Sequence, residues 1–238
     1  MALALREHNI PFNDNGPSSR SEVLARYRRL REISKSHHHE ILDCISSDAL
    51  LRQARRLGLA RGRTLILDDM DEMNYVYDLA IHTASPGSSR AIDRYARSAR
   101  LAAGSDEALV LEGMRAARFS ILLIERRHDI AGLIATDLLR RAEVWLVDIG
   151  LESSMPDGAM MATRLFATEP FCMTAGVYVP FDLGLLKDVD AELPRRLGER
   201  QLTTLLDDRR FAEAIYRIAL ADGVMDRVVY QDPPGGAE

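Results

Sequence analysis

Cysteine is scarce in this 238-residue chain, and the two that occur, Cys44 and Cys172, stand far apart. Their spacing excludes a disulfide framework and the Cys-x-x-Cys or Cys/His patterns of zinc sites. We expect both thiols to be buried. Long apolar runs are also missing, because no window approaches the roughly 20 apolar residues that a membrane helix needs. The first residues lack a signal-peptide pattern, so the sequence predicts a soluble cytoplasmic protein without a membrane partner.

Lysine is nearly absent, since Lys35 and Lys187 stand against 29 arginines. This bias is typical of a GC-rich bacterial genome and does not by itself indicate a binding surface. The formal net charge of −5 is mild. This charge argues neither for nor against nucleic-acid binding.

Catalytic motifs are missing as well. There is no phosphate-binding glycine loop and no G-x-S-x-G nucleophile elbow. Ser120, Ser153, Ser154 and Cys172 could act as nucleophiles, with His128 as a base. Apolar neighbours in a predicted strand favour Cys172 as a buried structural thiol, and His128 is expected to be a solvated loop residue. No catalytic residue and no cofactor are predicted.

Helical patterns dominate the first half of the chain. Residues 1–18 are predicted to form a flexible arm. Residues 19–117 form a predicted helical domain that starts at a capping box of Ser19 and Glu22, with a break expected near Ser36. Caps and glycines predict further helices at about 48–57, 69–84, 88–103 and 105–117, with a short extended piece before the second of these.

Residues 118–181 are the one long stretch of β character. They predict about five strands in a small β-barrel or a bent meander, with a one-turn insertion near residues 151–155. Residues 182–230 return to helical patterns, with helices at about 190–206 and after Asp207 or Asp208, and residues 231–238 are predicted to be a disordered tail. The predicted fold class is α+β, and its sheet edges require cover by the C-terminal helices or by a second subunit in a homodimer.

A metal site is one candidate for function. Consecutive residues on a helix are about 100° apart, so the run from His37 to Glu40 cannot all face one ion. Asp78 and His82, four residues apart, share a face of a predicted helix. A divalent-metal set of His37, His39, Asp78 and His82 would suit a metal-dependent hydrolase. The simpler interpretation is a polar helix end with a surface contact between Asp78 and His82.

A basic segment is the second candidate. Residues 20–63 contain ten arginines and Lys35 against five acidic residues. Such asymmetry indicates an anion-binding or nucleic-acid-binding surface. Its candidate contacts are Arg26, Arg28, Arg29, Arg52, Arg55 and Arg56. Tyr27 is the only aromatic residue of the segment, so a platform for stacking bases is poorly supplied.

These features favour a non-catalytic interaction or regulatory protein of a bacterial cytoplasm, with a protein partner. Nucleic-acid binding through the basic helices is the first alternative, and a metal-dependent hydrolase is the second.

Overall fold

The computed structural model describes residues 19–85, 87–197 and 210–224. Over these ranges the chain is a mixed α+β protein, as predicted, with helices at both ends of a five-stranded sheet. The predicted arm and tail lie outside the described residues. In chain order the elements are α1 (Arg20–Asp43), α2 (Ser47–Leu57), β1 (Ala60–Arg61), β2 (Thr64–Leu65), α3 (Met70–His82), α4 (Ala91–Ser98), α5 (Asp106–Arg115), β3 (Arg118–Arg127), β4 (Leu133–Asp137), β5 (Ala142–Leu146), α6 (Ile149–Ser154), β6 (Met160–Ala167), β7 (Cys172–Phe181), α7 (Leu183–Leu197) and α8 (Arg210–Asp222).

Helix α1 is one uninterrupted helix of 24 residues. The predicted capping box is present, because the Ser19 side chain accepts from the Glu22 amide while the Glu22 carboxylate accepts from the Ser19 amide. The break expected near Ser36 does not occur. The hydroxyl of Ser36 is exposed and donates to Glu40 one turn later, so it does not compete for the helix backbone.

A β-hairpin follows α2 where an extended piece was predicted. Helix α2 is capped by Ser46 and ends at Gly58, whose φ of 84° is left-handed and suits glycine. Strands β1 and β2 then pair antiparallel. The later helix α4 is shorter than predicted. Ser89 does not cap it, and instead receives hydrogen bonds from Arg94 and Arg97.

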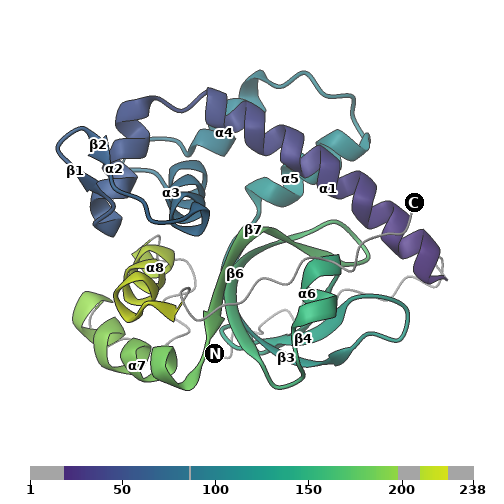
Figure 1. Cartoon of the computed structure of the whole chain (residues 1–238). Helices are drawn as coiled ribbons and strands as arrows, with labels where there is room; N and C mark the ends of the chain where they lie inside the picture. The colour runs from purple at the N-terminus through teal and green to yellow at the C-terminus, as the bar shows by residue number, and fades with distance from the viewer. Residues whose placement is uncertain (1–18, 86, 198–209, 225–238) are drawn as a thin grey trace, which may run out of the picture.

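The five long strands pair in the order β3-β4-β5-β7-β6, and β6 pairs back with β3, which closes the sheet. Strand pairing is limited at one place in the closed sheet. Strands β5 and β7 share a single parallel pair, Leu146 with Cys172, and a hydrogen bond from the Val147 amide to the Cys172 carbonyl. We call this place the seam. The predicted insertion is α6, which lies at the open end of the sheet (Figure 1).

The inside of the sheet is filled by apolar side chains, including Met161, Leu165 and Cys172. The predicted buried thiol of Cys172 is confirmed, and burial raises its pKa. Cys44 is exposed, so the prediction that both thiols are buried was wrong. Cys44 is the C-cap of α1, and its side chain is exposed between the buried residues Ile41 and Ile45.

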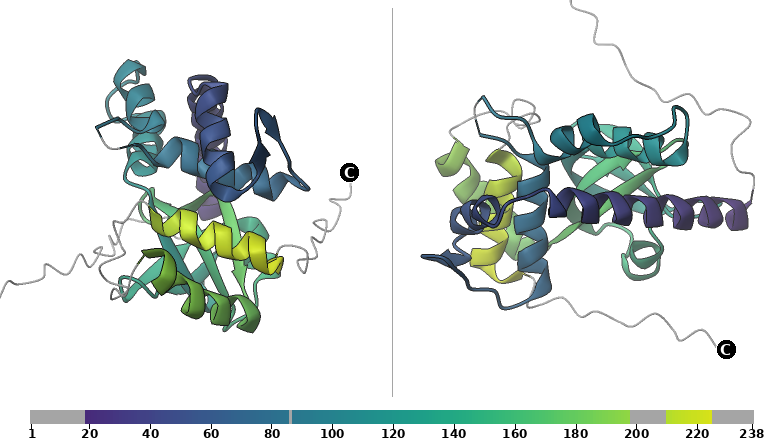
Figure 2. Two further views of the ribbon diagram at one scale, coloured as in Figure 1. Left: turned by 90° about the vertical axis from the view of Figure 1, so that its left-hand side faces the viewer. Right: turned by 90° about the horizontal axis from the view of Figure 1, so that it is seen from above.

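Helices pack on the outside of the sheet in two groups. One apolar cluster joins α2, α3, α7 and α8 to the outer face of β6 and β7. Another joins α1, α4 and α5 to the end of the sheet that is at the top in Figure 1. Two further views show α1 running over the sheet and α8 lying between α7 and the helices near the N-terminus (Figure 2). Helix α7 begins seven residues earlier than predicted. The predicted capping of the last helix by Asp207 or Asp208 lies outside the described residues.

Candidate functional site

The residues of the predicted metal set lie in separate environments. His37 is buried, its Nε2 donates to the carbonyl oxygen of Glu107 at 2.9 Å, and its Nδ1 lies 2.9 Å from the Tyr95 hydroxyl. That hydroxyl in turn donates to the Glu40 carboxylate. His39 is exposed and its nearest described carboxylate is that of Asp43, 3.8 Å away on the same helix.

Asp78 is bound by a buried arginine. The guanidinium of Arg164 on β6 donates to both carboxylate oxygens, at 2.6 and 2.8 Å, and the Tyr216 hydroxyl on α8 donates to one of them at 2.9 Å. Burial alone would raise the pKa of Asp78, but the charge of Arg164 outweighs it and the pKa lies below its usual value. Asp78, Arg164 and Tyr216 therefore form a buried three-residue pin between α3, the sheet and α8.

His82 lies one turn after Asp78, and the structure gives neither of its ring nitrogens a hydrogen-bond partner. Its exposed fraction is 7%. Burial, followed by the charge of Arg164, lowers its pKa well below the usual value. His38 also lowers the pKa of His82, and His38 was not in the predicted metal set. His38 donates from Nδ1 to the Ser34 carbonyl oxygen, and burial lowers its pKa too.

The structure does not assemble the predicted metal set of His37, His39, Asp78 and His82. Within the described ranges, no three His, Cys, Asp or Glu side chains are grouped so that they could hold a metal ion. The physical reason is that α1 presents successive histidines to different surroundings, while Arg164 neutralises Asp78 directly. Sequence reasoning missed Arg164. Its signal in the sequence is one charged residue inside the otherwise uncharged run of β6.

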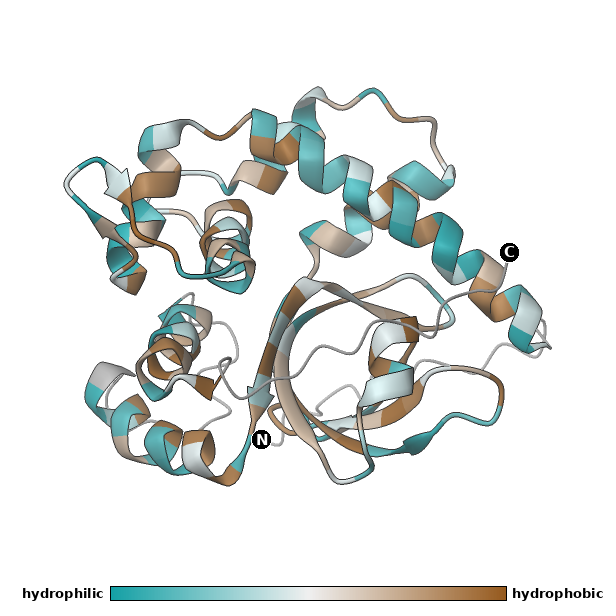
Figure 3. Ribbon diagram, in the orientation of Figure 1, coloured by the Kyte–Doolittle hydropathy of each residue, from teal (hydrophilic) through white to brown (hydrophobic). Residues whose placement is uncertain are grey.

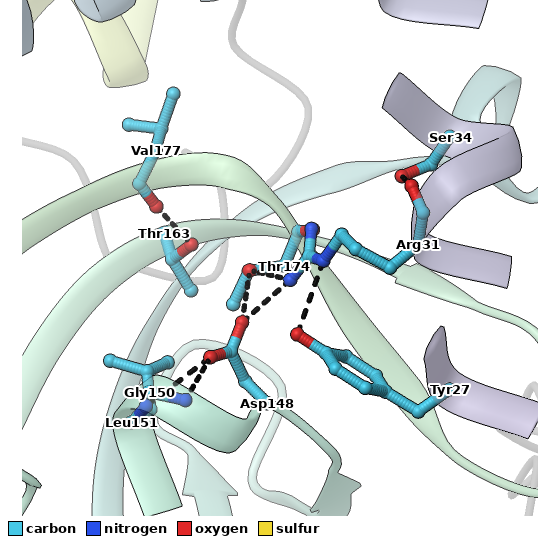
Figure 4. A network of polar contacts seen from close by, with 9 residues as sticks. All are labelled: Tyr27, Arg31, Ser34, Asp148, Gly150, Leu151, Thr163, Thr174 and Val177. Atoms are coloured by element: carbon cyan, nitrogen blue, oxygen red, sulfur yellow. Dashed lines mark hydrogen bonds and ion pairs between the residues drawn. The ribbon is translucent and has the colours of Figure 1, made fainter. Parts of the chain in front are cut away.

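A second polar network joins α1 to the seam of the sheet (Figure 4). Arg31 donates to the Asp148 carboxylate at 2.6 Å, and to the carbonyl oxygen and hydroxyl of Thr174 on β7. The Asp148 carboxylate also accepts from the amides of Gly150 and Leu151, and so caps α6. Arg31 thus links α1 to Asp148, just after β5, and to Thr174 on β7, two residues after the single β5–β7 pair.

The predicted basic contacts separate into two groups in the structure. On α1, Arg26 and Arg29 both bind the carboxylate of Asp106 at 2.6 Å. Arg28 on the same helix is exposed. Two arginines of the first group therefore share one carboxylate at the start of α5.

The second group is part of a larger cationic surface. Arg52, Arg55 and Arg56 lie on the exposed side of α2, opposite its buried residues Leu51, Ala54 and Leu57. The exposed residues Arg61 and Arg63 flank Gly62 at the tip of the β1–β2 hairpin. We call Arg52, Arg55, Arg56, Arg61 and Arg63 the arginine surface. The hairpin arginines were counted in the basic segment but were not singled out as contacts.

The positive charge of the arginine surface is poorly neutralised. Arg55 donates to a backbone carbonyl, that of Gly62. Arg56 and Arg63 approach carboxylates only at 3.9 and 3.7 Å, from Glu213 and Asp48. Among the residues that the structure describes, the side chains of Arg52 and Arg61 form no hydrogen bond or ion pair. In Figure 3 the hairpin tip and parts of α2 are teal, beside brown apolar segments of the same elements.

The side chains considered as nucleophiles or bases have structural contacts. Ser153 and Ser154 donate to the carbonyl of Gly150. His128 stacks on Trp145 with ring centroids 4.0 Å apart, and burial lowers its pKa. It is a half-buried residue packed on an aromatic ring, so the expectation of a solvated loop residue was incomplete.

Comparison with known proteins adds the following. A family model described as a family of unknown function, DUF7986, matches residues 21–218. No curated protein and no solved structure matches the chain. No helix in the described ranges has both the length and the apolar character needed to cross a membrane.

Proposed function

The chain belongs to DUF7986, a family of unknown function, and we propose that it is a non-catalytic cytoplasmic protein that binds nucleic acid through the arginine surface. The partner is recognised by its phosphate backbone. Planar guanidinium groups match the geometry of phosphate groups, and their binding releases counterions from the nucleic acid.

The observation that supports this proposal is uncompensated charge. Five arginines occur within residues 52–63, and no acidic residue lies among them. Elsewhere many arginines are closely paired, as Arg20 is with Glu152 and Arg90 with Asp93, at 2.6 and 2.7 Å. Five exposed guanidinium groups on neighbouring elements, none with a described carboxylate closer than 3.7 Å, form a concentrated positive surface for an external anion.

The direct test is binding of a fluorescently labelled mixed-sequence DNA duplex, measured by anisotropy at low and high salt. The double variant Arg52→Gln with Arg61→Gln removes two charges without breaking a described contact. Counterion release predicts about fivefold weaker binding per lost phosphate contact near ~0.15 M salt, so about 30-fold for the pair.

The matched control is Arg94→Gln with Arg97→Gln, which removes the same charge from α4, where both side chains bind only Ser89 among the described residues. We expect it to retain nearly full affinity. Equal losses in the two double variants would indicate a general charge effect and contradict the proposal. An absence of salt-sensitive binding by the unmodified protein would also contradict it.

A further inference from the structure

The arrangement of the arginine surface suggests which form of nucleic acid it fits. Three of its guanidiniums come from the helix α2 and two from the hairpin tip that follows it. The hairpin is fixed to the helix, because Nε and Nη2 of Arg55 both donate to the carbonyl oxygen of Gly62. The Leu59 amide also donates to the carbonyl of Ala54 at 2.8 Å. The two groups of charges are therefore held at a set relative position before any ligand binds.

The segment that carries the arginine surface has no aromatic side chain. No Phe, Trp or Tyr occurs between residues 47 and 74, and Tyr75, the next aromatic residue, is buried. Proteins that bind single strands rely on aromatic rings, which contribute about 1–3 kcal/mol for each stacked base. The residues of this surface can contact phosphates, but none of them carries a ring that could stack on an unpaired base.

We infer, on the basis of the proposed function, that the arginine surface selects double-stranded over single-stranded nucleic acid and contacts its backbone without reading sequence. A duplex presents one phosphate charge per about 1.7 Å of axis, counting both strands, so a rigid cluster of cations meets more phosphates on it than on a flexible strand. The partner is a nucleic-acid duplex of any sequence.

The test compares one labelled DNA duplex with each of its separated strands, at equal salt and with the full chain. We expect the duplex to bind at least about tenfold more tightly, with little change when the sequence is scrambled. Equal or tighter binding of the single strands overturns this inference and leaves the proposed function standing. Failure to bind either form refutes the proposed function itself.

Two further arms sharpen the result. Vesicles containing an anionic phospholipid present phosphate without a duplex, and binding to vesicles but not to DNA overturns the inference in favour of a membrane surface. The variants Arg52→Ala and Arg55→Ala each remove one charge, but only the second also removes the side-chain hydrogen bonds that link α2 to the hairpin tip. We expect Arg55→Ala to lose more duplex affinity than Arg52→Ala, and equal losses contradict a role for the fixed hairpin.

Discussion

His82 is the residue whose surroundings suit it least. Both ring nitrogens are buried without a hydrogen-bond partner in the structure, and such a group typically costs about 1–3 kcal/mol. The charged or titratable groups acting on it are Arg164, Asp78, His38 and Arg90, from four different elements. Spacing along the helix placed His82 on the face of Asp78, but it could not reveal that an arginine 86 residues later takes the aspartate.

The depressed pKa of His82 makes stability depend on pH with a definite sign. The unfolded chain binds a proton near the usual histidine pKa of 6.5, whereas the folded protein does so only at lower pH. The unfolded state therefore holds more protons in this window, and stability falls as pH drops below about 6.5.

Replacing His82→Leu should remove this penalty. We expect the variant to be about 1–2 kcal/mol more stable near neutral pH, because two unpaired polar atoms are lost, and the gain should grow at about pH 5.5. Urea unfolding at the two pH values measures both effects. Some acid sensitivity should persist, since His38 and His128 also have lowered pKa values. A variant less stable than the parent at both pH values would contradict this account.

At the scale of elements, local signals predicted helix starts well. Ser19, Ser46 and Ser105 each cap a helix through their side chains, and these caps depend on residues three positions apart. The seam of the sheet could not be predicted in this way. Arg31 reaches Asp148 and Thr174 across more than a hundred residues, and in the sequence it is only one of several arginines beside an apolar stripe.

The contact between α1 and the seam should be a large contributor to stability. Arg31 and Asp148 each have only 15% of their side chains exposed, so Arg31→Met leaves a largely buried carboxylate without its charge partner. We expect a loss of about 2–4 kcal/mol in urea unfolding, with faster amide exchange across residues 149–154. Arg28→Met, on the exposed side of the same helix, is the control and should change stability by less than about 0.5 kcal/mol. Similar behaviour of the two variants would show that the network is unimportant.

At the scale of the whole molecule, the cores extend across the predicted segments. One cluster contains Leu79 from the predicted helical domain, Val179 from the β-stretch and Ile215 from the C-terminal helices. The sequence predicted the class and the order of these parts, because each has its own periodicity. It could not predict how they share apolar surface, since that depends on contacts between residues distant in the chain.

We expect the pin of Asp78, Arg164 and Tyr216 to make α3, the sheet and α8 unfold together. Arg164→Met leaves Asp78 buried and uncompensated, and we expect it to cost about 3–5 kcal/mol. The double variant Asp78→Leu with Arg164→Met removes both charges and should recover a large part of that loss. Differential scanning calorimetry of thermal unfolding measures the stability of the single and the double variant. A double variant no more stable than the single one would mean that the buried charge is not the cause.

The arginine surface is likewise a property of the whole molecule, because folding places α2 and the hairpin tip together, while many other described arginines bind a carboxylate closely. The most direct test is the salt dependence of duplex DNA binding. Five phosphate contacts predict a slope of about −4.5 in a plot of the logarithm of the association constant against the logarithm of salt concentration. The variant Arg52→Gln with Arg61→Gln should reduce the steepness by about 1.8, and the control at Arg94 and Arg97 should leave it unchanged. A slope near zero for the unmodified protein, or the same slope in the parent and the Arg52–Arg61 variant, would contradict the account.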